Sequence, residues 1–194
     1  MHYTRIATFL LGAWIFGGLY MGFVATQNFR TVDRILSSPP AEAAKIIDTA
    51  GHDNARLLLR HLASEENRLF FENWEILELV LGGALTGLLW FGIEKPLLAG
   101  FTGALVLLTA FEHLKITPEM LWLGRSIDFL PRTPEPLART QFGRLHALYG
   151  VIEVTKLLLA MLVTGLLFAL RCGSVRPQVE IEPVDDAHHR HVNR

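Results

Sequence analysis

The sequence predicts an all-α integral membrane protein, built as a four-helix antiparallel bundle with a helical cap outside the bilayer. The first reason is composition, because 51% of the 194 residues are hydrophobic. The second is their distribution, since they gather in long blocks and do not alternate with polar residues as in half-buried strands. The third is length, because four blocks can each cross a hydrocarbon layer about 30 Å thick.

Charge and cysteine content exclude several classes of protein. The formal net charge is −1, so nucleic-acid binding has no electrostatic support. The single cysteine, Cys172, excludes a disulfide within the chain and any zinc site that needs two thiolates. The length suits one domain, which we place at residues 1–171, followed by a polar tail at 172–194.

The first span is predicted at about 5–27. Residues 6–25 are uncharged and form a longer run than the apolar core of a usual signal peptide, so we expect an uncleaved helix. The helix should continue to the Ser-Ser-Pro-Pro sequence at 37–40, because proline lacks an amide donor and disfavours helix before it. Two glycine pairs have the spacing that lets helices approach closely, and these are Gly18 with Gly22 and Gly83 with Gly87.

The second span, at about 74–93, is predicted to continue a helix that begins within an extramembrane connector at 28–73. A short helix over 41–50 should end at Gly51, and Asp53 or Asn54 could cap the long helix that follows. Trp74 and Trp90 then mark the two membrane interfaces.

The third span, at about 96–114, should follow through a tight turn at 94–96, which makes spans two and three an antiparallel hairpin. Thr117 and Pro118 predict a new helix at about 118–129 that lies at the interface, within a second connector at 116–144. Prolines at 131, 134 and 136 predict a stiff linker, and the fourth span is expected at about 145–170. The tail ends in His-His-Arg-His, which fits either a solvated end or a metal-binding tail.

The orientation follows from the basic residues near the span ends. Lysines and arginines are more numerous in the connectors 28–73 and 116–144 than on the opposite side. The positive-inside rule therefore predicts a plasma (inner) membrane protein with both connectors cytoplasmic and both termini external.

Ionisable residues from three spans are predicted to share one depth. From the helical rise, Lys156 lies roughly 22 Å from Arg171 at the far interface, and Glu78 lies roughly 24 Å from Glu94. Both values place the side chains just inside the face that carries the two connectors. We call this set of residues the polar shelf, and it comprises Glu75, Glu78, Glu112, Glu153, Tyr149, Lys156, His113 and His146.

The polar shelf has two interpretations. In the structural one, charged pairs such as Glu153 and Lys156 hold the bundle together near the headgroups. In the functional one, the polar shelf lines a shallow cavity that binds a proton, a cation, a haem or a polar substrate, because ionisable residues inside a membrane mark functional sites. His113 and His146 could ligate haem iron or, with the carboxylates, a transition metal. The Glu-x-x-His motif of di-iron bundles is absent.

Short motifs in three of the helices resemble those of the transmembrane protein 205-like family. They are Gly-Ala-Trp at 12–14, Phe-Val at 23–24, Phe-Arg at 29–30, Thr-Pro at 117–118 and Phe-Gly-Arg-Leu-His at 142–146. The resemblance implies a four-helix membrane domain of unclear biochemical activity, distantly similar to copper-resistance-type and haem-handling membrane proteins. Where that family tends to carry asparagine, seven residues after the motif histidine, this chain has Glu153, and its glutamate-rich segment before the second span also looks additional. The acidic character of the polar shelf is therefore not implied by the resemblance.

These observations predict a multi-pass, non-enzymatic membrane component, which is either a small transport or accessory protein or a subunit of a larger membrane assembly. The alternative is a haem- or metal-binding redox protein that uses His113 and His146. The expected partners are the lipid bilayer and either a second copy of the chain or a larger membrane complex.

Overall fold

The computed structural model describes residues 2–130 and 137–173. Every element in these ranges is helical, which confirms the all-α prediction. The predicted proline linker and the tail beyond Gly173 lie outside the described residues. In chain order the elements are α1 (His2–Ser37), α2 (Ala41–Ala50), α3 (His52–Gly87), the π-helical turn η1 (Leu88–Gly92), α4 (Pro96–Phe111), the π-helical turn η2 (Glu112–Ile116), α5 (Thr117–Ile127) and α6 (Leu137–Gly173).

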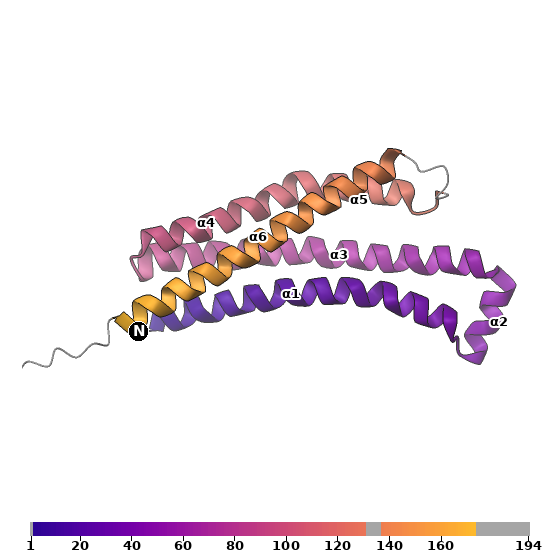
Figure 1. Ribbon diagram of the computed structural model, residues 1–194, viewed down its shortest axis with the longest axis horizontal. Coiled ribbons are helices and arrows are strands. Elements are labelled where there is room, and N and C mark those ends of the chain that lie inside the picture. The colour runs from indigo at the N-terminus through magenta and orange to yellow at the C-terminus, as the bar shows by residue number, and fades with distance from the viewer. Residues whose placement is uncertain (1, 131–136, 174–194) are drawn as a thin grey trace, which may run out of the picture.

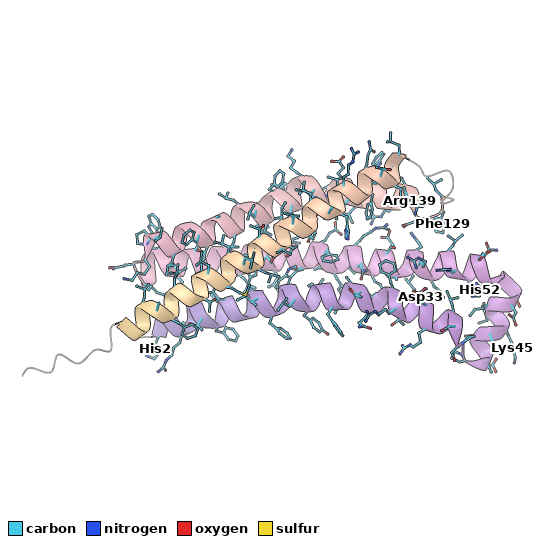
Figure 2. The ribbon with its side chains drawn as sticks, viewed as in Figure 1. His2, Asp33, Lys45, His52, Phe129 and Arg139 are labelled. Carbon is cyan, nitrogen blue, oxygen red and sulfur yellow. The ribbon has the colours of Figure 1, made fainter. Side chains whose placement is uncertain are left out.

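Four helical segments are long and apolar enough to cross a membrane, namely His2–Ser37, His52–Gly92, Pro96–Ile127 and Leu137–Leu170. They form an antiparallel bundle in which α3 packs against α1 and α4, and α6 packs against α1, α4 and α5. The start of α1, the α3–α4 connection and the end of α6 lie at one end of the bundle, and α2 lies at the other (Figure 1). Figure 2 shows Lys45 and His52 at the α2 end and His2 at the opposite end.

The long helices are apolar on their outer faces as well as inside. Leu11, Trp14, Leu85, Leu89 and Leu105 are almost completely buried and form the centre of the bundle. Phe9, Phe91, Leu97, Leu107 and Leu158 project outward and are more than half exposed. A helix that is apolar all round is typical of a membrane span, because lipid is as apolar as the protein interior.

The chain reversals occur where the sequence predicts them, but one predicted cap is wrong. Gly51 ends α2 with φ 82°, and Glu94 makes the α3–α4 turn with φ 56°. Neither Asp53 nor Asn54 caps α3, which begins at His52 without a side-chain cap; instead the Asn54 amide donates to the Ala50 carbonyl at 2.9 Å. Because Gly51 reverses the chain in a single residue, both polar residues already lie in the first turn of the helix.

The helix predicted at about 118–129 is present as α5, with Pro118 in its first turn, but the predicted threonine cap and the break before it are wrong. The third long helix continues through both residues, since Ile116 keeps helical dihedrals of φ −79° and ψ −49°. Proline removes one hydrogen bond and crowds the carbonyl four residues earlier. The π-helical turn η2 lies directly before it and provides a wider turn of backbone there. As a result α5 extends α4 instead of forming a separate helix.

The glycines that bring helices close together are not the predicted pairs. A Cβ atom built on Gly17 would lie 2.1 Å from the Trp74 ring, and one on Gly82 would lie 2.7 Å from Trp14. Gly22, Gly83 and Gly87 have nothing within 4 Å of such an atom in the described part of the chain, whereas Gly18 packs against Leu157. The helices are therefore rotated so that Trp74 packs over Gly17 and Trp14 packs over Gly82. Each of these glycines directly precedes a predicted pair in the sequence.

Candidate functional site

A buried lysine stands at the centre of the polar shelf. The Lys156 ammonium lies 2.5 Å from Glu78 Oε2, 2.6 Å from Glu112 Oε2 and 2.8 Å from Glu153 Oε1. Lys156, Glu78 and Glu112 have at most 1% of their side chains exposed, and Glu153 has 20%. We call these four residues the lysine–carboxylate cluster.

Three of the four long helical segments supply the lysine–carboxylate cluster. Glu78 comes from α3 and Glu112 opens η2, while Glu153 and Lys156 stand one turn apart on α6. The Thr109 hydroxyl of α4 lies 3.4 Å from both Lys156 Nζ and Glu78 Oε2. The equal depth predicted from helical rise is thus matched by direct contact between these helices.

A second buried carboxylate lies one turn nearer the α2 end. Glu75 Oε2 is 2.9 Å from His113 Nδ1, and Glu75 Oε1 accepts a hydrogen bond from the Thr117 hydroxyl at 2.5 Å. Thr117 was predicted to be a helix cap, but it pairs with a carboxylate of another helix because η2 carries the chain on as a helix past it. The polar shelf therefore has two contiguous parts, the lysine–carboxylate cluster and the Glu75–His113–Thr117 group.

Several buried oxygens of the polar shelf have no hydrogen-bond partner among the described residues. Glu78 Oε1, Glu112 Oε1 and the Tyr149 hydroxyl also have no ion-pair partner there, whereas Glu112 Oε2 and Glu153 Oε1 are in ion-pair contact with the Lys156 ammonium. Buried polar atoms are normally paired, so each of the first three oxygens is suited to a proton, a water molecule or a cation. Tyr149 is 5% exposed, and its ring packs edge-on against Phe71, with the ring centroids 5.7 Å apart.

Two adjoining cavities lead from the α2 end of the bundle towards the polar shelf. Their volumes are about 790 and 490 Å³, and they share Phe29, Ser64, Arg68, Phe142 and His146, so we treat them as one cleft. The smaller, inner cavity reaches Thr117 and Tyr149. The inner part of the cleft is therefore lined by Thr117, which donates to Glu75, and by Tyr149 of the polar shelf.

The structure does not bring all the predicted site residues together. His113 belongs to the Glu75 group, whereas His146 is exposed, stacks on Phe142 and lines the cleft. The two histidines proposed as paired ligands therefore have different surroundings. The spacing of His146 and Lys156 along α6 places both on one stripe of that helix. The bundle buries only the part of this stripe from Tyr149 onward.

A third charged group, which the sequence analysis missed, joins α3 to α5. Arg68 donates to both oxygens of Asp128 at 2.9 and 3.0 Å and also pairs with Glu65. Arg125 donates to Glu65 at 3.0 Å, and this bond lowers the pKa of Glu65 to about 2. No local motif marks the pairs that join α3 to α5, because the two residues of each pair are 60 positions apart.

Two triads could offer a metal ion three ligand atoms within 4.8 Å of one another in the described ranges: His61 with Glu65 and Asp128, and Glu78 with Glu112 and Glu153. Each triad already contacts a protein cation, Arg68 in the first and Lys156 in the second. A metal ion would have to replace or displace that cation, so metal binding has only weak support from this geometry. The haem- or metal-binding alternative stays a prediction, which an absorption spectrum and a metal analysis of the purified protein would test.

The fold and the polar shelf define the class, which is an all-α bundle with four helices apolar enough to span a membrane and a charged group buried between them. Comparisons with protein-family models, with curated proteins and with solved structures found no match. The resemblance to the transmembrane protein 205-like family thus stays a prediction.

Proposed function

We propose that this chain is a multi-pass membrane protein that takes up and releases protons, or a small cation in their place, at the lysine–carboxylate cluster. It serves as a small transport or accessory component of the membrane, with the cluster as its working site. The observation that carries the proposal is a single buried ammonium in contact with three carboxylates.

The charge balance of the cluster supports uptake of a cation. Three ionised carboxylates and one ammonium leave two excess negative charges in a site where three of the four side chains are almost fully buried. An unpaired buried charge costs several kcal/mol, and lipid gives it no compensating solvation. Binding one or two protons, or a cation, lowers this cost, and the unpartnered oxygens of Glu78 and Glu112 are acceptors for them.

The cleft supports a route for exchange from the α2 end. Its inner cavity is lined by Tyr149, one turn before Glu153 on α6. It also reaches Thr117, which donates to Glu75. Hydroxyl groups both donate and accept hydrogen bonds, so they can pass a proton between the cleft and the carboxylates. With the positive-inside orientation, this route opens to the cytoplasm.

Infrared difference spectroscopy of the protein in lipid nanodiscs tests the proposal. Stepping the pH should change a band from a protonated carboxylic acid in a dry environment, because a carboxylate of the cluster gains or loses a proton. Glu112→Gln should remove or shift this band, and the same variant in proteoliposomes should change the rate at which an internal pH indicator responds to an imposed gradient.

Glu119→Gln is the matched control, because Glu119 is exposed on α5 and makes no ion pair in the described structure. It should leave the band and the proteoliposome response unchanged. If neither variant alters the spectrum and Glu112→Gln changes only stability, the lysine–carboxylate cluster only stabilises the packing of the helices and the proposal fails.

A further inference from the structure

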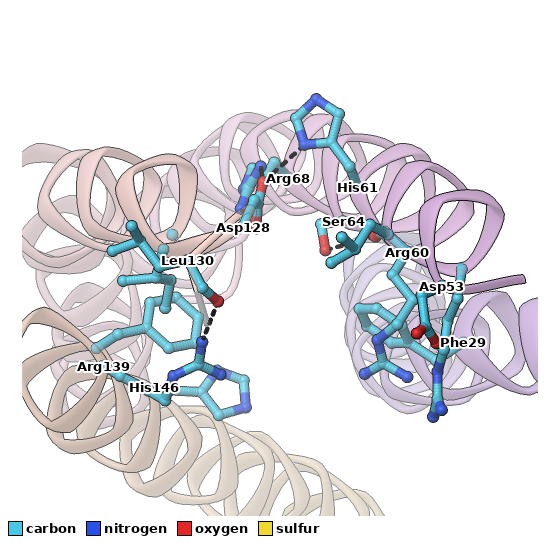
Figure 3. Close-up of a pocket in the computed structure, with 15 residues that line it drawn as sticks. Phe29, Asp53, Arg60, His61, Ser64, Arg68, Asp128, Leu130, Arg139 and His146 are labelled. Atoms are coloured by element: carbon cyan, nitrogen blue, oxygen red, sulfur yellow. Dashed lines mark hydrogen bonds and ion pairs between the residues drawn. The ribbon is translucent and has the colours of Figure 1, made fainter. Parts of the chain in front are cut away.

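The cleft at the α2 end is a candidate ligand site, because it is large and its two halves differ in chemistry. Its cavities of about 790 and 490 Å³ lie in the size range of ligand pockets. Figure 3 shows its outer half, with Arg139 and His146 on one side and Phe29, Asp53 and Arg60 facing them. The first side belongs to α6 and the second to α1 and α3.

The outer half is cationic. Four arginines and two aspartates line it, which leaves two positive charges when its histidines are neutral; these residues are Arg56, Arg60, Arg68, Arg139, Asp53 and Asp128. Arg68 and Asp128 satisfy each other, so they do not set the charge of the cavity. The excess comes from the arginines on the two facing walls.

Two of these arginines have few polar partners among the residues that the structure describes. Arg139 makes one long contact, 3.4 Å to the Leu130 carbonyl, and its buried Nε has no partner among the described residues. Arg60 lies 3.9 Å from Asp33 and 5.2 Å from the centre of the Phe29 ring. Both guanidinium groups therefore keep donors for an anion, and guanidinium geometry suits a carboxylate or a phosphate.

The inner half is largely apolar. Phe29, Phe71, Met120, Leu121 and Phe142 line it together with Tyr149. Its charged lining residues are Arg30 and Asp33, which have opposite charges, and Arg68, which is paired with Asp128. The wall formed by α1 and α3 is fixed by the Asn28 amide, which donates to the Asn67 side-chain oxygen at 2.6 Å. A ligand that fits both halves has an anionic group at one end and an apolar body at the other.

We propose that the cleft binds an anionic amphiphile, with its carboxylate or phosphate between Arg60 and Arg139 and its apolar body along Phe29, Phe71 and Phe142. The orientation agrees with the fold, because the apolar body points towards the long apolar helices and the anionic end towards the polar α2 end. The amphiphile would lie in the same cleft as the proposed proton route, but the inference does not require proton exchange at the lysine–carboxylate cluster, and the labelling experiment tests it separately.

Photolabelling of the full chain in nanodiscs tests the inference. The probe is a long-chain fatty acid with a photoactivatable group in its chain, and mass spectrometry maps the labelled residues. Saturable labelling should appear on the cleft segments around Phe29 and Phe142, and unlabelled fatty acid should displace it. The methyl ester of the probe should label these segments roughly tenfold less, because one charge-assisted hydrogen-bond pair is lost.

Two variants separate the anion site from general lipid contact. Arg139→Gln and Arg60→Gln, on opposite walls, should each reduce cleft labelling roughly tenfold. Arg144→Gln is the control, because Arg144 is exposed on α6 and outside both cavities. Labelling of outward-facing residues such as Phe91 reports contact with lipid and should not change in any variant.

Three results would overturn the inference. One is equal cleft labelling by the acid and the ester, and another is labelling that neither arginine variant reduces while both variants remain folded. The third is full displacement of the probe by inorganic phosphate alone, which would show a site for small anions with no part for the apolar half.

Discussion

Lys156 illustrates how a single residue organises the interior of this bundle. Its side chain is completely buried, and it contacts carboxylates from α3, η2 and its own helix. Removal of one partner from a buried ionic group is far more costly than removal of the whole group, because the remaining charges lose their compensation without regaining water. Lys156 and its carboxylates are therefore expected to depend on each other for stability.

Replacing this lysine by methionine tests that dependence. Lys156→Met should lower the free energy of unfolding by about 3–5 kcal/mol, because three carboxylates then lose their only close cation in the described structure. Neutralising the partners as well, with Glu78→Gln and Glu112→Gln, should recover much of the loss. Thermal and denaturant unfolding in detergent micelles measures both effects.

Lys115→Met serves as the control, because Lys115 is exposed and follows Glu112 by three residues. It should change stability by less than about 0.5 kcal/mol. An equally small effect of Lys156→Met would mean that the ammonium does not hold the carboxylates in place.

At the scale of elements, the π-helical turn η2 explains why the third long helix differs from its prediction. A π-helical turn has one residue more than an α-helical turn and so changes the direction in which later side chains point. Here η2 lies between Thr109, which points at Glu78, and Thr117, which points at Glu75. Glu75 and Glu78, the two buried carboxylates of α3, are thereby contacted from the same long helix.

The packing of α1 on α3 gives a test at the element scale. Gly17→Ala should destabilise the protein by about 1–3 kcal/mol, since its Cβ would lie 2.1 Å from the buried Trp74 ring and the helices would have to separate. Gly22→Ala, on the same helix, should be nearly neutral because nothing lies within 4 Å of its Cβ. Unfolding of the two variants in micelles measures the difference, and equal losses would contradict this packing.

Considered as a whole molecule, the bundle places its two kinds of polar site at different levels. The polar shelf lies among the long apolar helices, whereas the cleft and the Arg68–Asp128 group lie towards the α2 end, where Figure 2 shows the cleft-lining residues Asp33 and Arg139. The four long segments run alternately in opposite directions, so both ends of the described chain lie at the same end of the bundle. Membrane insertion in this arrangement puts α2 and the α3–α4 turn on opposite faces.

Accessibility of introduced cysteines tests the proposed topology. In a Cys172→Ser background, Lys45→Cys on α2 and Lys95→Cys in the α3–α4 turn should react with a membrane-impermeant maleimide from opposite sides. The positive-inside rule predicts that Lys95→Cys reacts from outside in intact cells and Lys45→Cys only after the membrane is opened. Labelling of both positions from one side would contradict a crossing between them.

The sequence by itself determined where each element lies along the bundle axis. Block length, charge-free runs and the Ser-Ser-Pro-Pro stop predicted α1 to Ser37, and helical rise placed Glu78, His113, Glu153 and Lys156 at one depth. These features depend on local composition and on fixed helix geometry, so they can be derived without knowing any neighbour.

Only the tertiary structure decided which of these residues meet. Rotation of a helix about its own axis depends on packing with its neighbours, such as Trp74 over Gly17, and hydropathy and rise carry no information on it. That rotation turns Lys156 towards three carboxylates and leaves His146 exposed on the cleft, although both lie on one stripe of α6. The same reason explains why the pairing of Arg68 with Asp128, across about 60 residues, had no signature in the sequence.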